Sequence, residues 1–514
     1  MADFPFNAPL PTTIAPSDQL SKVVDIGGQV FNVKAFGAKG DGATDDTAAI
    51  QAAINAASTG SDAFFPYTSL GYLCGQITVP SGVRLVFANG AKLVAPSSLA
   101  VPWIQAQQSV VHDGTAILNG TFDASATTNT GVTQVINFSG VTSCPNLRIQ
   151  SNRIINAPVH GIQIGEATYT SDIKWIVGNS VEGHGIAATG YGIFPNYVGN
   201  VLVEGNYVYS TNADDAIELG RSGPAQLGGL NAHLRAVGNV CVNGQLQFPF
   251  SDYAEIIGNT VIGNTIQNDT NTANHVSVIG NTVMDATPAA GYAGIRVSGD
   301  DCLIDSNNVT VTANDGISVT SVSSGSITNN RIYSSNSIGN SGSAINDNGA
   351  TSLTINGNNC DGISGNGFAY GLNLTGSFHS VTGNAFRGGC FNGYTGTVTN
   401  TEIADNFFGV YNNALAAGMG AGGIMRSNRG INPVGLQSVA VPASGTAVAA
   451  TYYDRLFYVT ASTSTVAVDI TDAKGTSQSV ATIPASGFGV VMVPASSSMT
   501  PTYTVAPTWT VFGN

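Results

Sequence analysis

Charged side chains are scarce in this chain of 514 residues. Asp, Glu, Lys and Arg make up 9% of the sequence, against about 25% in an ordinary soluble protein. The net charge is −14, and the 17 basic residues show no clustered basic patch. We therefore expect no nucleic-acid partner. An acidic ligand would need a locally cationic site, because the protein as a whole repels polyanions.

Long hydrophobic runs and cysteine motifs are also missing. No stretch of about 18 apolar residues is present, so no membrane insertion is expected. The start, Met-Ala-Asp-Phe-Pro, lacks the basic and apolar regions of a signal peptide, and we expect none in this chain. The six cysteines are scattered without a C-x-x-C pair, which favours free core thiols over a disulfide framework. No metal site and no cofactor are expected.

What the chain does contain is a repeat anchored on asparagine. The spacing between successive anchors runs from 20 to 33 residues. The segments between them alternate apolar and polar residues, as in Val201-Leu202-Val203, which indicates short strands. The anchors are Asn152, Asn179, Asn206, Asn239, Asn259, Asn281, Asn307, Asn330, Asn358, Asn384, Asn406 and Asn428.

Strands repeated at such a short period cannot bury their apolar sides alone, so they stack into a solenoid. We predict an all-β fold, a right-handed parallel β-helix of about 12 or more coils. The asparagines are expected to stack as an amide ladder. The residues two positions later, such as Val208, Cys241 and Cys360, are expected to form one apolar column inside the coils.

The two ends of the chain differ from this repeat. Residues 1–30 are rich in proline and threonine and are predicted to be an extended lead-in. A strand at residues 31–36 is expected to precede a helix at about 45–57, with Thr44 as its N-cap, and this helix would cover the open end of the solenoid. The β-helix is predicted to span residues 31–430. Residues 431–514 are predicted to form a separate β-rich domain for capping, trimerisation or glycan binding.

Residues 31–57, followed by Phe64-Phe65-Pro66, Gly71-Tyr72 and Ile77-Thr78-Val79-Pro80, resemble the N-terminal segment of the pectate-lyase-like β-helix superfamily. This resemblance implies a carbohydrate-acting protein with its site in a groove along one face of the β-helix. The superfamily includes phage tailspike depolymerases and polygalacturonase-like hydrolases. An extracellular or virion-associated location and a homotrimer are compatible with that layout.

A second recurring element is a Gly or Ala followed by Ile or Leu. If this Ile points inward, the next residue points outward by strand alternation. The residue before each step forms a neighbouring column that includes His160, His184 and Asp215. The predicted outward column consists of Gln163, Ala187, Glu218, Arg296, Ser318 and Asn346.

The longest coil carries the densest group of acids. Asp214, Asp215 and Glu218 precede an insertion at residues 221–235, and insertions in solenoids often line the binding face. Glycoside hydrolysis needs one carboxylic acid and one carboxylate, about 6.5–9.5 Å apart in inverting enzymes. In a regular strand Asp215 and Glu218 would be ~10 Å apart, so a bulge or turn is needed to bring them into range. We predict these acids as catalytic, with Asp214 as the substitute.

Seven further residues are candidates for substrate binding. The arginines could bind a carboxylate on an acidic sugar, and the aromatic rings could stack on sugar rings. Gly183-His184-Gly185 and Asp214-Asp215 resemble polygalacturonase motifs but occur in the reverse order. The candidates are His160, His184, Arg221, Arg296, Trp175, Tyr191 and Tyr197.

The sequence therefore predicts an endo-acting, inverting glycoside hydrolase that degrades a polysaccharide. Two alternatives remain open, a polysaccharide lyase or uronan epimerase on the same fold and a non-catalytic glycan-binding spike. A lyase would want a Lys or Arg base, and Lys174 is the one lysine in the central repeats.

Overall fold

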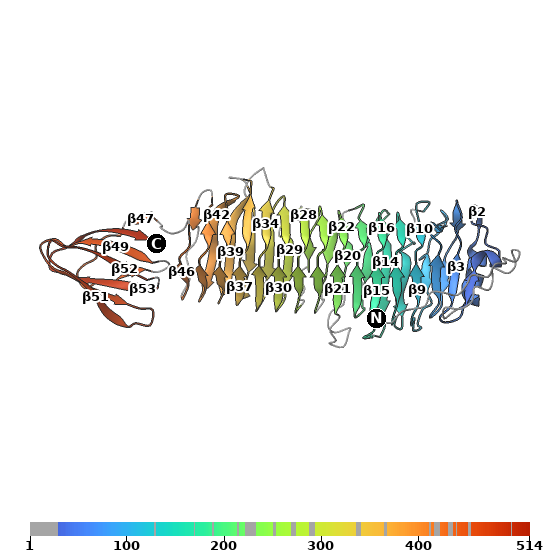
Figure 1. Ribbon diagram of the computed structural model, residues 1–514, viewed down its shortest axis with the longest axis horizontal. Coiled ribbons are helices and arrows are strands. Elements are labelled where there is room, and N and C mark those ends of the chain that lie inside the picture. The colour runs from blue at the N-terminus through green and yellow to red at the C-terminus, as the bar shows by residue number, and fades with distance from the viewer. Residues whose placement is uncertain are drawn as a thin grey trace, which may run out of the picture.

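The computed structural model shows a long β-helix followed by a small β-sandwich (Figure 1). It describes residues 29–127, 130–168, 170–187, 190–212, 215–220, 233–249, 253–268, 274–286, 293–335, 341–363, 367–410, 413–415, 422–429, 435–437, 439–450, 454–494 and 496–513. In the described part, no helix is both long and apolar enough to cross a membrane.

Each coil contributes a strand to three parallel sheets that run the length of the β-helix. The first sheet contains β1 (Val30–Asn32), β3 (Asp62–Phe65), β6 (Arg84–Phe87), β9 (Ala116–Leu118), β12 (Arg148–Gln150), β15 (Lys174–Val177), β18 (Val201–Glu204), β21 (Leu234–Val237), β24 (Glu255–Ile257), β27 (Ser277–Ile279), β30 (Cys302–Asp305), β33 (Gly325–Thr328), β37 (Leu353–Asn356), β40 (Ser380–Thr382), β43 (Glu402–Ala404) and β46 (Ile424–Arg426).

The second sheet follows the first within each coil. It contains β2 (Asp41–Asp45), β4 (Gly71–Leu73), β7 (Lys92–Val94), β10 (Thr121–Asp123), β13 (Arg153–Ile155), β16 (Ser180–Glu182), β19 (Tyr207–Tyr209), β22 (Val240–Val242), β25 (Thr260–Ile262), β28 (Thr282–Ala286), β31 (Asn308–Val311), β34 (Arg331–Ser334), β38 (Asn359–Gly362), β41 (Ala385–Phe386) and β44 (Phe407–Phe408).

The third sheet closes each coil. It contains β5 (Ile77–Val79), β8 (Ile104–Ala106), β11 (Gln134–Val141), β14 (His160–Glu166), β17 (Ile193–Pro195), β20 (Asp215–Glu218), β23 (Gln245–Gln247), β26 (Ile266–Gln267), β29 (Ala293–Ser298), β32 (Asp315–Thr320), β35 (Ser343–Asn348), β39 (Phe368–Ser377), β42 (Cys390–Thr399) and β45 (Asn413–Leu415), and β36 (Ala350–Thr351) pairs with β39. The predicted parallel β-helix is confirmed.

The asparagine ladder joins successive coils between the first and second sheets. Each anchor from Asn152 to Asn406 donates from Nδ2 to Oδ1 of the next anchor at 2.8–3.1 Å. The same amides also donate to backbone carbonyls of the preceding coil, and the anchors are at most 2% exposed. The predicted ladder, including Asn428 at its end, is confirmed.

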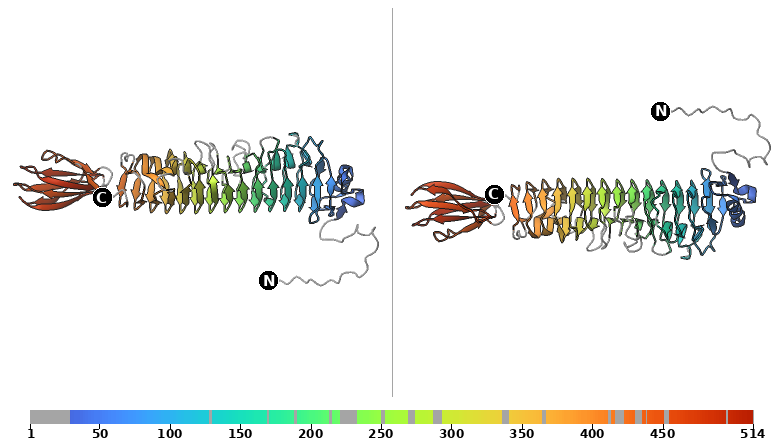
Figure 2. Two further views of the ribbon diagram at one scale, coloured as in Figure 1. Left: turned by 90° about the horizontal axis from the view of Figure 1, so that it is seen from above. Right: turned by 90° about the horizontal axis from the view of Figure 1, so that it is seen from below.

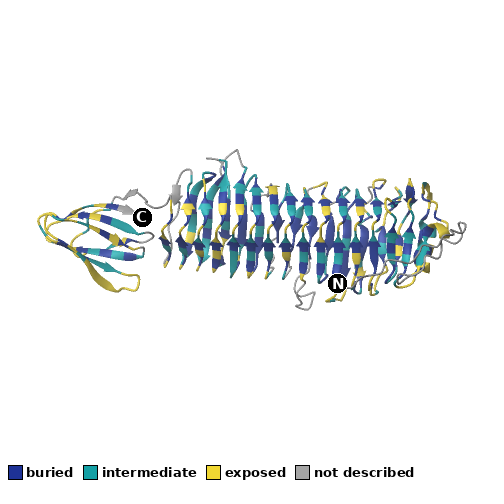
Figure 3. Cartoon of the chain, in the orientation of Figure 1, coloured by how far each residue is buried: buried dark blue, intermediate teal, exposed yellow. Residues whose placement is uncertain are grey.

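The core is built from columns of buried side chains that occupy equivalent positions in successive coils (Figure 3). Val208, Cys241 and Val261 are aligned neighbours on the second sheet, and Cys360 lies between Ile332 and Phe386 farther along. These side chains are all fully buried. All six cysteines are buried free thiols. The predicted apolar column is therefore confirmed.

The inward residue of the Gly-Ile step stacks on the third sheet, where Ile193 aligns with Ile217. Packing explains why a glycine precedes this residue. A Cβ at Gly192 would lie 2.2 Å from Cγ1 of Val208 on the second sheet, and one at Gly316 would lie 2.3 Å from Cγ2 of Ile332. The two sheets approach so closely here that only a very small residue fits.

The N-terminal end is covered by helix α1 (Thr47–Ala56), which buries Ile50, Ala53 and Ile54 (Figure 1). Two local predictions were wrong. The first strand ends at Asn32 and continues as the 3-10 helix η1 (Val33–Phe36). The helix begins at Thr47, so the N-cap position is occupied by Asp46, whereas Thr44 belongs to β2 and donates from its backbone N–H and hydroxyl to the Asp41 carboxylate.

The opposite end of the molecule carries an antiparallel β-sandwich (Figure 2). One sheet has the order β47 (Gly435–Gln437), β54 (Thr508–Gly513), β49 (Arg455–Thr460), β52 (Phe488–Val493). The other has the order β48 (Val448–Ala450), β53 (Ser497–Thr502), β50 (Val466–Thr471), β51 (Ser477–Ile483). The sandwich has its own core, which includes Phe457, Val468 and Met499.

The ladder predicts a large difference between two neighbouring asparagines. Asn307→Ala removes a buried amide that bonds to both adjacent anchors and to the Val278 carbonyl. We expect it to lower the free energy of unfolding by about 2–4 kcal/mol, because the partners are left buried and unsatisfied. Asn308→Ala, on the outward side of β31, is the control and should cost less than about 0.5 kcal/mol. Urea unfolding measures both, and equal losses would contradict a stabilising ladder.

Candidate functional site

The outward column of the third sheet is polar along most of its length. Its members follow the inward column by one residue, as predicted from strand alternation. The column contains Gln105, Asn137, Gln163, Phe194, Glu218, Gln247, Gln267, Arg296, Ser318, Asn346, Asn373 and Thr395. Glu218, Arg296, Ser318 and Asn346 thus lie where the sequence placed them.

Ala187 does not belong to this column, and that prediction was wrong. The coil contains two candidate steps, His184-Gly185-Ile186 and Gly192-Ile193-Phe194. The second one forms β17, so Phe194 takes the outward position beside Glu218. His184 lies in a turn between strands and is fully buried.

Amide side chains along the face bond to one another across coils. Asn137 Nδ2 donates to Gln105 Oε1 at 2.8 Å, and Asn373 Nδ2 donates to Asn346 Oδ1 at 2.9 Å. Gln267 Nε2 donates to Gln245 Oε1 at 2.7 Å. The face is therefore a pre-ordered row of hydrogen-bonding groups.

Asp215 and Glu218 are the first and last residues of β20, and a β-bulge separates them. Asp215 aligns with Gln245, Ile217 with Leu246 and Glu218 with Gln247. Three residue steps on β20 thus match two on β23. The two acids occupy positions equivalent to residues i and i+2 of a regular strand, about 7 Å apart at ~3.3 Å per residue. Both stand on the outward side, because Gln245 and Gln247 share a face. Asp215 is half-buried and Glu218 is 3% exposed.

An aromatic cluster borders the acids on the side of the preceding coils. The Tyr191 ring lies parallel to the His160 ring at 5.0 Å between centroids, and the Phe194 ring lies 4.4 Å from Tyr191. The Tyr191 backbone N–H donates to His160 Nδ1 at 2.9 Å. Since this nitrogen accepts a hydrogen bond, His160 is neutral with its proton on Nε2. The cluster is joined directly to the acid-bearing strand by Gly192 N–H, which donates to the Asp215 carbonyl at 3.1 Å.

Both central histidines are held in the neutral form. Burial lowers the pKa of His160 to about 4. Burial also lowers the pKa of His184 to about 4, although its Nδ1 contacts the Gly190 carbonyl at 3.1 Å. His184 packs against the interior and has no exposed surface. Its predicted role in substrate binding does not fit this position.

Trp175 is also misplaced by the prediction. It lies on β15 in the first sheet, on a different side of the coil from the acids, with the Arg148 guanidinium 4.9 Å from its ring centroid. Tyr197 is half-buried in the turn after β17, and Asp214 and Arg221 lie outside the described residues.

A third carboxylate on the same sheet, that of Asp315, accepts two hydrogen bonds. Asp315 accepts the Ser343 backbone N–H at 2.6 Å and the Asn346 amide at 2.7 Å. Burial raises its pKa. No group of three or more His, Cys, Asp or Glu side chains that could hold a metal ion lies within the described ranges.

A buried ion pair beside this face was not predicted from the sequence. Lys174 Nζ lies 3.2 Å from Glu166 Oε2, and both side chains are completely buried. The ammonium also donates to the Thr170 and Gly199 carbonyls, while Glu166 Oε1 accepts the Cys144 N–H at 2.7 Å. Lys174 is thus bound inside the coil and does not reach the face as a base.

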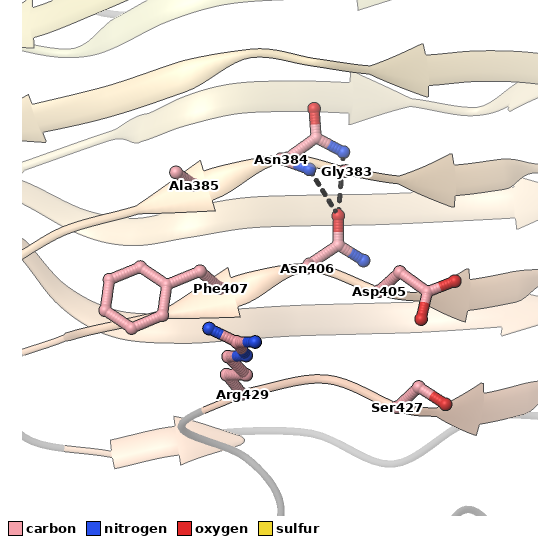
Figure 4. A pocket seen from close by; sticks show the side chains of 8 residues that line it. All are labelled: Gly383, Asn384, Ala385, Asp405, Asn406, Phe407, Ser427 and Arg429. Carbon is pink, nitrogen blue, oxygen red and sulfur yellow. Dashed lines mark hydrogen bonds between the residues drawn. The ribbon is translucent and has the colours of Figure 1, made fainter.

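The last coils carry a separate pocket with a volume of about 390 Å³ on the side of the second sheet. Asp405 lies at one end, while Phe407 and Arg429 lie at the other (Figure 4). None of its lining residues belongs to the third sheet, so it is not part of the candidate site.

Comparisons with known proteins agree with this architecture. Residues 30–227 match the family model described as "Rhamnogalacturonase A/epimerase, pectate lyase-like". The non-secreted LysM effector LysM19 of Penicillium expansum is 43% identical over 77 residues, which cover 13% of this chain and only 6% of that protein.

Two of the similar solved structures are a phage tailspike protein, which shares the β-helical fold, and a polygalacturonase with a lower structural similarity. The tailspike protein of E. coli bacteriophage HK620, solved with a pentasaccharide, is 12% identical with a TM-score of 0.52, and the match covers 94% of this chain and 93% of that one. A family 28 exopolygalacturonase of Yersinia enterocolitica is 15% identical with a TM-score of 0.42, covering 78% of each chain.

The neutral histidines make stability depend on pH. An unfolded histidine has a pKa of about 6.5, so between about 6.5 and 4 the unfolded chain binds more protons than the folded one. The free energy of unfolding should therefore fall as pH is lowered through this range. Urea titrations at a series of pH values test this, and the decrease should be smaller in the double variant His160→Gln, His184→Gln. An unchanged decrease would contradict the buried neutral state.

Removing the Lys174 ammonium should lower the free energy of unfolding, because its partner Glu166 is buried. Lys174→Met leaves the Glu166 carboxylate without its cation, and we expect a loss of about 3–5 kcal/mol. The control is Arg153→Met, which breaks the exposed pair with Glu182 and should cost at most about 1 kcal/mol. Similar losses in urea unfolding would show that the Lys174 pair is not desolvated as described.

Proposed function

We propose that this protein, whose residues 30–227 match the pectate-lyase-like family model, cleaves a polysaccharide by endo-acting, inverting glycoside hydrolysis. The observation that carries the proposal is the bulge in β20. It brings Asp215 and Glu218 to a backbone separation of about 7 Å. From that backbone separation the two carboxyl groups can reach the ~6.5–9.5 Å spacing of inverting enzymes.

In this mechanism one of the two carboxyl groups protonates the glycosidic oxygen, and the other activates a water molecule on the opposite side of the sugar ring. Both groups come from one strand, so the backbone fixes their spacing without a contribution from another part of the chain.

The rest of the face supplies features suited to a sugar chain. The half-buried amides of Gln163, Asn346 and Asn373 offer both donors and acceptors along the coil axis. Arg296 lies farther along the same column and could bind an acidic group. Since the column continues on both sides of β20, an extended chain could pass across the acids in either direction, which favours internal cleavage.

A lyase or epimerase is the second candidate, because the matching family model names an epimerase. Lys174 is unsuited as its base, since the ammonium is buried against Glu166. Among the described residues of the outward column, Arg296 is a cation that could serve such a reaction. Action on a polysaccharide would place the protein outside a cell or on a virion.

The decisive experiment measures product ends from a panel of neutral and acidic polysaccharides. New reducing ends without ultraviolet absorbance from unsaturated sugars indicate hydrolysis, whereas absorbing ends indicate a lyase. Asp215→Asn and Glu218→Gln should each lower the rate by at least about 10²-fold, the usual contribution of a general acid or base.

The matched control is Glu255→Gln, which changes an exposed glutamate on the first sheet and should leave the rate unchanged. Cleavage that survives both changes on β20 would reject this pair. Lack of cleavage on every glycan, with retained binding, would favour a glycan-binding spike.

A further inference from the structure

The pocket in the last coils has the size and position of a separate binding site. It spans three successive coils on the side of the second sheet, and its volume of about 390 Å³ lies near the lower end of the ~300–1,000 Å³ range of small-molecule sites. Gly383 and Ala385 line it from the first of these coils. Their small side chains leave room beside Phe407 and Arg429, which align with Ala385 on the next two coils (Figure 4).

One end of the pocket is formed by Asp405, which precedes an anchor of the asparagine ladder. The backbone is left-handed at this position, with φ of 66° at Gly383 and 56° at Asp405. In the other coils of the ladder the position is occupied by Gly, Ser or Asn. The Asp405 carboxylate is exposed and forms no hydrogen bond or ion pair with the residues that the structure describes. It is therefore available to accept hydrogen bonds from a ligand.

The Phe407 ring lies at the other end in an orientation that its neighbours fix. A Cβ at Gly409 would lie 2.6 Å from Cε1 and Cζ of this ring, so the ring packs directly against the Gly409 backbone. The Arg387 guanidinium lies 5.9 Å from the ring centroid, and its Nε donates to Asn359 Oδ1 at 3.0 Å. Phe407 remains 41% exposed, so the ring offers an ordered apolar surface to a ligand.

Three exposed arginines surround the pocket or continue from it along the same side. Arg331 aligns with Asn359, which binds Arg387, and Arg429 aligns with Phe407. Within the described part of the chain, none of the three forms an ion pair with a carboxylate, and the arginines that do so lie on other coils or on the first sheet. In a protein with a net charge of −14, this is a locally cationic surface of the kind that an acidic ligand needs.

We propose that this pocket is a second saccharide site, which binds a uronic acid unit of the polysaccharide. The Arg429 guanidinium binds the sugar carboxylate, the Phe407 ring contacts the apolar side of the sugar, and the Asp405 carboxylate accepts hydrogen bonds from hydroxyl groups. The inference rests on the proposed function for its ligand class and adds that the polysaccharide is acidic. Because the pocket lies on the second sheet, polymer held there leaves the third-sheet face open to another part of the same chain.

The arrangement of charges favours a uronic acid over simpler ligands. Asp405 and Arg429 lie at opposite ends of the pocket (Figure 4), and no ion pair joins them. A simple anion would use Arg429 alone, would gain nothing from Phe407 and would be repelled by Asp405. A neutral sugar would contact Asp405 and Phe407 but leave the charge of Arg429 unused. A uronic acid uses all three groups.

A fluorophore placed in the pocket tests the proposal without interference from the third-sheet face. Phe407→Trp retains an aromatic ring, and the natural tryptophans lie elsewhere, at Trp103 in an early coil, Trp175 on the first sheet and Trp509 in the sandwich. Digalacturonate should change the tryptophan emission of the Phe407→Trp protein and leave that of the wild type unchanged.

Adding Arg429→Gln to Phe407→Trp tests the contact with the carboxylate. It should weaken binding of digalacturonate by at least about 10-fold, because a hydrogen bond to a charged group is lost. The weaker binding of the neutral disaccharide cellobiose should not change, which a general disturbance of the fold would not reproduce. The matched control is Arg153→Gln, because Arg153 also directly follows a ladder anchor but lies in an early coil. It should leave both affinities as they are.

Three results would overturn the proposal: no response to digalacturonate at millimolar concentrations, an equal response to sodium sulfate at the same ionic strength, or equal losses for both disaccharides in the Arg429→Gln protein. The emission does not depend on turnover. A response in a protein that cleaves no polysaccharide would therefore support this site and reject the hydrolase, whereas cleavage without a response would reject this site alone.

Discussion

The whole β-helix depends on each coil repeating the same inward positions at the same register. The asparagine ladder enforces this, since each amide must meet the next one within hydrogen-bonding distance. A shift of one residue would break the ladder and turn the apolar columns outward. The connecting segments can differ in length from coil to coil, whereas the strands that carry the inward positions cannot. The strict interior therefore leaves the outward columns and the connecting segments free to carry function.

The candidate site shows how a local irregularity adds chemistry to such a regular scaffold. In an undistorted strand, three residue steps place two carboxylates ~10 Å apart. The bulge in β20 compresses three steps into the length of two while keeping Ile217 in its inward column. β-Bulges are common beside active sites because they redirect side chains. Here the bulge shortens the spacing between Asp215 and Glu218 and leaves the buried core positions unchanged.

Features that recur in every coil could be predicted from the sequence. Features that depend on which residues of a single coil enter a strand could not. The asparagines, Cys241 and the outward positions of Glu218 and Arg296 follow from the period. The prediction for His184 was wrong because its coil contains two Gly-Ile steps. Only the closure of the coil decides that Ile193 enters the sheet. Trp175 was predicted to lie beside the acids and was misplaced, because each coil has three outward faces and local alternation cannot choose among them. The partner of Lys174 is eight residues away across a turn, a spacing that no strand pattern marks.

Two surfaces of this protein make different demands on a partner. The face of the third sheet presents amides whose mutual hydrogen bonds keep them ordered, so a ligand rich in hydroxyl groups can exchange for water at little cost in side-chain entropy. The outer face of β52 in the sandwich, where Phe488, Val490 and Met492 are exposed, offers almost only apolar area, which is favourable to cover but unsuited to orient a sugar. In a chain with 9% charged residues, two acids on one short strand, β20, are an unusual concentration of charge. The contrast separates a hydrogen-bonding face on the β-helix from an apolar face on the C-terminal sandwich.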